Sequence, residues 1–159
     1  MKQEIKARYP APAAAVIKMF SDPAFHEQKL KALGIARFQV LASSKKGDEF
    51  SIRIERKVPV DLPVPGMKGV EATAVHEERW NAATKSGRVE VDAKGVPATI
   101  ACQAKFADDA DGCTLTYTWT IESRVPLVGG KIEKAIASDM VKMSAPETQV
   151  GVERVDEYR

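Results

Sequence analysis

The chain has 159 residues and a mass of 17.3 kDa, the size of one domain that buries about 70% of its unfolded surface. Hydrophobic residues make up 44% of the sequence and charged residues 29%, a globular composition that excludes the disordered, fibrous and low-complexity classes. We therefore predict a single domain that spans residues 1–159.

The formal net charge of +2 conceals an uneven distribution along the chain. Residues 1–58 carry 12 basic against 6 acidic side chains, whereas residues 59–159 carry 12 against 16. The basic residues are scattered singly, as on a solvated face, and no basic stripe is interleaved with aromatic residues. The sequence therefore predicts no nucleic-acid partner.

The chain begins with a polar stretch, Lys2–Lys6, where a signal peptide would be apolar, and it contains no run of about 18 apolar residues. We therefore expect a cytoplasmic protein without stable membrane insertion. The two cysteines belong to neighbouring predicted strands, and the expected register places Cys102 near Tyr117 and Cys113 near Phe106. Both are predicted to be free thiols, as in a reducing compartment.

The amino-terminal part predicts one strand followed by two short helices. Lys2–Tyr9 alternates charged and apolar residues, and Pro12–Phe20 is alanine-rich with apolar residues spaced for one helix face. Ser21–Pro23 supplies a cap and a first-turn proline for the second helix, which is expected to end at Leu33 before Gly34.

Six further strands are predicted, separated by segments with turn residues. The segment Pro59–Gly69 holds three prolines and two glycines, so it is expected to form a loop, which could act as a lid. The predicted strands are Ile35–Ser43, Glu49–Val58, Ala72–Ala83, Arg88–Lys94, Ala98–Phe106 and Thr114–Ser123.

The last strand and the segment after it are the most informative part of the chain. Leu115–Ile121 alternates apolar residues with threonines, which is typical of a strand with one buried face. The helical pattern that follows has one apolar stripe, so this stripe and the strand face are expected to pack together. Pro146 predicts a kink or a restart of the helix. The stripe consists of Val128, Ile132, Ile136, Met140 and Met143.

This order of elements resembles the helix-grip fold of the START-like superfamily, also called SRPBCC or Bet v 1-like. A closer similarity, to the uncharacterised bacterial family known as domain of unknown function 2505, is carried by Tyr9–Pro12, Glu78–Trp80 and Val125–Glu133. The resemblance implies an α+β fold with a curved seven-stranded antiparallel sheet around a long C-terminal helix. It also implies two short helices after strand one and a ligand cavity between sheet and helix. It implies no reaction, because superfamily members include lipid carriers, polyketide cyclases, hormone receptors and chaperone co-activators.

A polar cluster is predicted inside the apolar cleft. If Phe50–Ile54 alternates with its apolar residues inward, Arg56 shares their face, and the partner strand can set His76 and Glu78 beside it. Arg56 suits a ligand carboxylate or phosphate, and His76 or Glu78 suits a general base if burial moves its pKa toward neutral. The alternative, and the commoner arrangement, is an ordinary ion cluster at the rim.

The lining of the expected cavity is mainly apolar and aromatic. For the aromatic residues, the alternative to lining a cavity is to fill the structural core. Methionine suits the lining of a ligand site and the filling of a gap in the core about equally. The sequence does not decide which alternate residues of the fourth strand face inward. Val75, Glu77 and Arg79 form the competing inward set. The predicted ligand-binding residues are Phe50, Ile52, Ile54, Trp80, Ile100, Phe106, Leu115, Tyr117, Trp119, Ile132, Ile136, Met140 and Met143.

Three classes of function follow from these patterns. The first is a carrier or sensor for a small hydrophobic ligand, lipid-like or polycyclic. The second is a cyclase-, hydratase- or dehydratase-like enzyme that uses Arg56, His76 and Glu78, and the third is a protein-interaction module with a collapsed cavity. No metal and no cofactor are predicted, because the two histidines, His26 and His76, lack metal-ligand spacing and no nucleotide-binding motif is present. The sequence leaves ligand identity and oligomeric state open.

Overall fold

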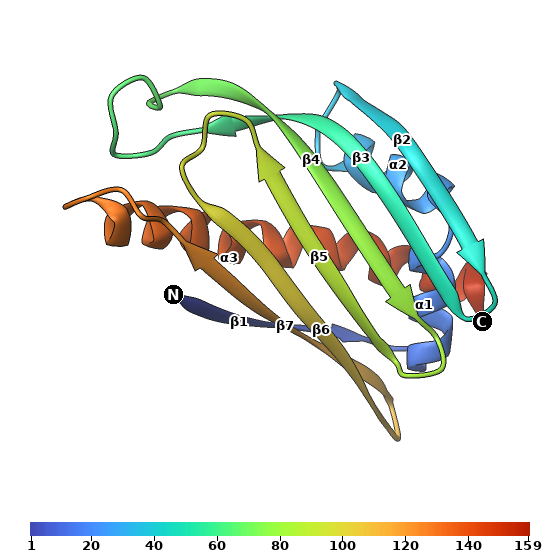
Figure 1. Cartoon of the computed structure of the whole chain (residues 1–159). Coiled ribbons are helices and arrows are strands. Elements are labelled where there is room, and N and C mark those ends of the chain that lie inside the picture. Colours follow the sequence, from blue (N-terminus) through green and yellow to red (C-terminus); the bar gives the residue numbers. More distant parts are fainter.

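Seven antiparallel strands form one curved sheet in the order β1-β7-β6-β5-β4-β3-β2, and the structure, a computed structural model, describes residues 1–159 (Figure 1). Strands β2 to β7 pair with their neighbours in sequence, and β1 pairs with β7 at one edge. This is the sheet implied by the helix-grip resemblance. The strands are β1 (Lys2–Tyr9), β2 (Phe38–Lys46), β3 (Glu49–Val60), β4 (Val70–Asn81), β5 (Ser86–Ala93), β6 (Thr99–Asp109) and β7 (Gly112–Glu122).

The helices lie on one face of the sheet (Figure 1). The N-cap of α2 is Asp22, whose side chain accepts a hydrogen bond from the Ala24 amide, and Gly34 follows the helix with a φ of 78°. The predicted cap and terminating glycine are therefore confirmed. None of the helices combines the length and the apolar character of a membrane span. The helices are α1 (Ala13–Phe20), α2 (Pro23–Ala32), α3 (Gly129–Arg154) and the short 3-10 helix η1 (Val155–Tyr158).

Strands β3 and β4 turn the same parity of residues toward the helices. Ile52 and Trp80 are almost fully buried, whereas Arg79 is exposed on the opposite face, where it pairs with Glu77. His76 lies opposite Ile54 in the β3–β4 ladder and shares the inward face. The even-numbered parity of β4 is therefore the inward one.

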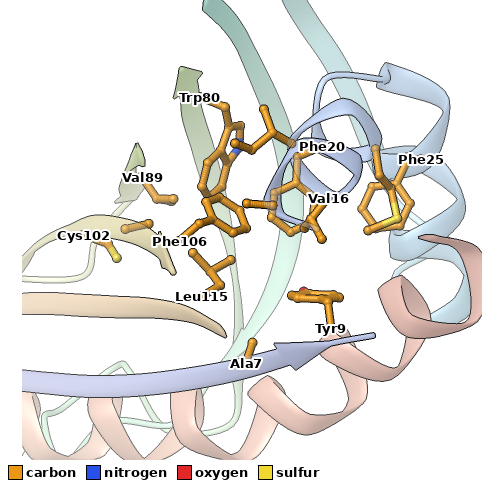
Figure 2. Packing of buried hydrophobic residues seen from close by; sticks show 14 of the residues in the cluster. Ala7, Tyr9, Val16, Phe20, Phe25, Trp80, Val89, Cys102, Phe106 and Leu115 are labelled. Atoms are coloured by element: carbon orange, nitrogen blue, oxygen red, sulfur yellow. The ribbon is translucent and has the colours of Figure 1, made fainter. Parts of the chain in front are cut away.

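Two hydrophobic clusters fill the space between the sheet and the helices. The larger one has 27 buried residues and contains an aromatic group around Phe20, a residue of α1 (Figure 2). The Phe20 ring lies 4.9 Å from the Trp80 ring and 6.3 Å from the Phe106 ring, measured between centroids. The smaller cluster is centred on Ile132 near the start of α3. The hydrophobic interior therefore consists of two clusters, one toward each end of the sheet.

Helix α3 runs without interruption through Pro146, so the predicted restart is wrong. The segment after the proline packs against the rest of the protein, because Val150 and Val155 are buried. A Cβ atom at Gly151 would lie 2.8 Å from the Tyr9 ring, which shows how closely the helix approaches β1. Burial of this last segment offsets the roughly 3 kcal/mol that an interior proline costs a helix.

The hairpin of β6 and β7 is tighter than the sequence indicated. Its strands extend to Asp109 and Gly112, so Cys102 pairs with Trp119 and Cys113 with Asp108, two residues away from the predicted register. Both thiols are free, as predicted, and the structure places both in the interior. Burial raises the pKa of Cys102 to about 12 and that of Cys113 to about 11, so both thiols stay protonated at neutral pH.

Replacing the central aromatic residue tests this arrangement of the core. We expect Phe20→Ala to lower the free energy of unfolding by about 3–5 kcal/mol, because it leaves a cavity between four aromatic rings. Urea unfolding followed by circular dichroism measures the change. The control Leu41→Ala removes a side chain that is 42% exposed and should cost about 0.5 kcal/mol or less. Equal losses in the two variants would contradict the assignment of Phe20 to the centre of the core.

Candidate functional site

A small polar pocket lies between α2 and strands β3 and β4. Its free volume is about 10 Å³, enough for one water molecule or one oxygen-sized group. The pocket combines basic, acidic and apolar side chains from three elements. Its lining consists of His26, Lys29 and Leu30 from α2, Ile54 and Arg56 from β3, and His76 and Glu78 from β4.

The polar side chains of this pocket form an ordered chain of contacts. The Trp80 Nε1–H donates a hydrogen bond of 2.9 Å to Glu78 Oε2, and Glu78 Oε1 lies 3.9 Å from His76 Nδ1. On its other side, His76 Nε2 lies 3.5 Å from Arg56 Nη2. Because a guanidinium can only donate, His76 Nε2 is the acceptor and the imidazole proton lies on Nδ1, facing Glu78. A Cβ atom at Gly87 would lie 2.2 Å from the Trp80 ring, so glycine at this position allows the indole to occupy its place.

Arg56 is the unusual member of the chain. Its Nε is the one buried side-chain nitrogen or oxygen atom in the protein that has no hydrogen-bond partner. No carboxylate lies within ion-pair distance of its guanidinium. The nearby carboxylate of Glu78 accepts a hydrogen bond from Trp80 instead. An unsatisfied buried donor costs about 1–3 kcal/mol, and more when it is charged. The pocket therefore holds a donor that no group of the protein satisfies, beside a space that one water-sized or oxygen-sized group can fill.

Both histidines of the pocket are neutral at neutral pH. Burial lowers the pKa of His76 well below its usual value, and the neighbouring Arg56 lowers it further, which outweighs the opposing effect of Glu78. Burial likewise lowers the pKa of His26. The Nε2 of His26 lies 2.7 Å from the carbonyl oxygen of Phe20, so it carries a proton and donates to that oxygen.

Glu78 is a carboxylate in this environment. Burial by itself raises the pKa of Glu78, but two residues of α2 act in the opposite direction, His26 in its protonated form at low pH and Lys29. His76 and the hydrogen bond from Trp80 also favour the charged form, and together these neighbours lower the pKa to about 2.

The charge balance of the pocket favours an anion. With both histidines neutral, the cations Lys29 and Arg56 face the single carboxylate of Glu78, which leaves an excess of one positive charge. In this partly buried site a negatively charged oxygen would be attracted to Arg56, whose Nε has no partner. No group of three or more histidine, cysteine, aspartate or glutamate side chains is placed to hold a metal ion.

The structure brings the three predicted polar residues together inside the protein. The side chains of His76 and Glu78 keep only 20% and 12% of their surface exposed, so the cluster is not an ordinary rim ion pair. Sequence reasoning missed the contribution of α2, from which Lys29 and Leu30 line the pocket. A weak signal in the sequence for the contribution of α2 was His26, which lies one turn before Leu30 on an apolar helix face.

Most of the predicted lining residues fall into two groups, and Met143 and Ile132 lie apart from both. The larger is buried and belongs to the aromatic and aliphatic core, as Figure 2 shows for Trp80, Phe106 and Leu115. A second group, Tyr117, Ile136 and Met140, is half-buried between sheet and helix, whereas Met143 is 38% exposed. Ile132 belongs to the smaller cluster. The core group is Phe50, Ile52, Ile54, Trp80, Ile100, Phe106, Leu115 and Trp119.

Comparison with known proteins identifies the family. Residues 4–155 match the sequence profile of a family described as a protein of unknown function, DUF2505. The chain belongs to the DUF2505 family. The family description assigns no activity, and no curated protein matches the chain significantly.

Solved structures confirm the fold of this DUF2505 protein. TTHA0849 from Thermus thermophilus is 18% identical with a TM-score of 0.66, covering 99% of this chain and 98% of its own. Ara h 8.0201 is 13% identical with a TM-score of 0.68 and the same coverage. The ZhuI aromatase/cyclase from Streptomyces sp. R1128 is 14% identical with a TM-score of 0.62, covering 99% of this chain and 94% of its own. The fold is therefore the helix-grip fold.

The neutral state of His76 predicts a pH dependence of stability. Its pKa is lowered in the folded protein, so the stabilisation is present above pH 6.5 and is lost as the pH falls below that value, where the unfolded chain binds the proton. Between pH 7 and pH 5 we expect the free energy of unfolding to fall. The fall in His76→Gln should be smaller by up to about 2 kcal/mol. Urea unfolding at the two pH values provides the measurement, and an equal fall in both proteins would contradict a neutral His76.

Proposed function

We propose that the protein is a cytoplasmic binding protein for a small molecule that joins an apolar body to an anionic oxygen group such as a carboxylate. The observation that carries this proposal is the buried Arg56 Nε, which lacks an acceptor beside a space of about 10 Å³. A carboxylate oxygen is a suitable acceptor for that donor. It fits the excess of positive charge, and one oxygen atom fits a space of this size.

The polar chain prepares Arg56 for this role. His76 accepts from the Nη2 of Arg56, which positions the guanidinium and leaves its Nε free. Trp80 holds the Glu78 carboxylate through Nε1, so this carboxylate does not neutralise Arg56. A ligand carboxylate would therefore gain hydrogen bonds to a charged donor, worth about 1.5–3 kcal/mol each.

The apolar body is assigned to the region between the sheet and α3. Tyr117, Ile136 and Met140 are half-buried there and pack at the margin of the larger core cluster. Ligand sites usually enclose about 300 Å³ or more, so the body must displace side chains as it enters. The unbranched side chain of Met140 is suited to such movement. The Bet v 1-like fold supports this placement, because ligands of that superfamily lie between sheet and helix.

A fluorescent fatty acid and its neutral ester test the proposal. We expect cis-parinaric acid to bind the wild-type protein about 10- to 100-fold more tightly than its methyl ester, because only the acid presents an anion to Arg56. Arg56→Met should remove this preference. Fluorescence titration measures both affinities.

Arg53→Met is the matched control for this titration. Arg53 lies on the same strand with its side chain 51% exposed and pairs with Glu77 on the outer face, so its replacement should keep the preference for the acid. Met140→Trp should weaken both probes by filling the space for the apolar body. A preference for the acid that survives in Arg56→Met would contradict the proposal, and failure of both probes to bind wild type would favour a protein-interaction module.

The neutral imidazole of His76 favours a second candidate, an enzyme of the cyclase, hydratase or dehydratase class. In that case His76 would act as the general base, oriented by Glu78 at 3.9 Å. A carrier needs His76 only as an acceptor for Arg56, a role that the amide oxygen of a glutamine can also fill. Conversion of a compound that co-purifies with the protein, by the wild type and not by His76→Gln, would identify the enzyme.

A further inference from the structure

Three loops gather at one end of the protein, toward the left of Figure 1, and the third leads into the first residues of α3. We refer to residues 61–69, 94–98 and 123–131 together as the loop end. Met67 of the first loop, Val96 of the second and Val125 of the third pack against the same small hydrophobic cluster. The Ser123 hydroxyl also donates a hydrogen bond of 2.8 Å to the carbonyl oxygen of Pro97. The three loops therefore form one joined surface.

Leu127 stands out on this surface. Its relative exposure is 102%, the highest among the large hydrophobic residues that are exposed, so its side chain contacts nothing in the protein. Its φ of 69° lies in the left-handed region, which is unfavourable for a leucine and natural for a glycine. The exposed side chain contributes no packing to the fold. A leucine held in this way suits a surface that buries it only after binding.

The charges around Leu127 are predominantly basic. The ionisable side chains of the loop end are Lys68, Lys94, Arg124 and Lys131 against Asp61, a net charge of +3. None of these five side chains lies within ion-pair distance of an opposite charge, although nine ion pairs occur elsewhere on the protein. The cations are therefore free to meet an anionic partner.

We propose that the loop end docks on the surface of an anionic membrane. Leu127 enters the boundary between headgroups and acyl chains, while Lys68, Lys94, Arg124 and Lys131 approach lipid phosphates. An apolar side chain combined with a cluster of basic residues is the pair of signals that reversible membrane binding requires. A second copy of the chain fits less well, because two surfaces of equal positive charge repel each other. The inference is independent of the proposed function, since docking uses no residue of the polar pocket.

Sedimentation with lipid vesicles tests the proposal. We expect the wild-type protein to bind vesicles that contain phosphatidylglycerol, to bind phosphatidylcholine vesicles much more weakly, and to dissociate at high salt. Leu127→Gly should weaken binding about tenfold or more while the melting temperature stays unchanged, because glycine suits the positive φ. Replacing Arg124 and Lys131 together by glutamine should weaken it roughly 25-fold, about fivefold for each charge.

Two controls make the result specific. Leu41→Asp changes an exposed leucine in strand β2 and should leave vesicle binding unchanged. Arg56→Met should also bind vesicles like the wild type, which separates this inference from the binding proposal. Three results would overturn membrane docking: no binding to phosphatidylglycerol vesicles, equal binding by Leu127→Gly and the wild type, or self-association that depends on Leu127 in analytical ultracentrifugation without lipid.

Discussion

The whole structure depends on covering the concave face of the sheet, which no single helix can do. Helix α3 packs along β1 and β7, whereas α1 contacts β4, β6 and β7 and places Phe20 against Trp80 and Phe106. The polar pocket lies beside α2, where the helical cover crosses β3 and β4. This division explains how one face contains both a tightly filled aromatic core and a small site with free hydrogen-bonding capacity.

Within this apolar face, the contacts from Trp80 through Glu78 and His76 to Arg56 form a polar line that is incomplete at one end. Each side chain in this line except Arg56 has a partner that explains its protonation and its hydrogen bonding. Trp80 holds the carboxylate, and the neutral imidazole of His76 both faces that carboxylate and accepts from the guanidinium. Under the proposed function, an anion bound here supplies the acceptor that Arg56 Nε lacks within the protein. The loop end and α2 lie toward opposite ends of the sheet in Figure 1, so the two proposed contacts do not compete for the same surface.

Residue patterns predicted the sheet and its inward face well, because strand alternation is a local property. The spacing of Phe50, Ile52 and Ile54 placed Arg56 inward, and the order of elements predicted the helix-grip fold. The failures involve contacts between distant segments. The apolar face of the first helix did not show that Phe20 would pack against Trp80, and His26 was only a weak signal that α2 would supply Lys29 to the pocket. Pro146 misled the prediction because burial of later residues keeps the helix intact.

The most direct test of an anion held by Arg56 is mass spectrometry of organic extracts from the purified wild type, Arg56→Met and Arg53→Met proteins. We expect an apolar compound with a carboxylate or another anionic oxygen group, present in near-stoichiometric amount in the wild type and in Arg53→Met. The same compound should be absent or strongly depleted in Arg56→Met. A neutral compound, or an anionic one recovered equally from all three proteins, would contradict an anion site at Arg56.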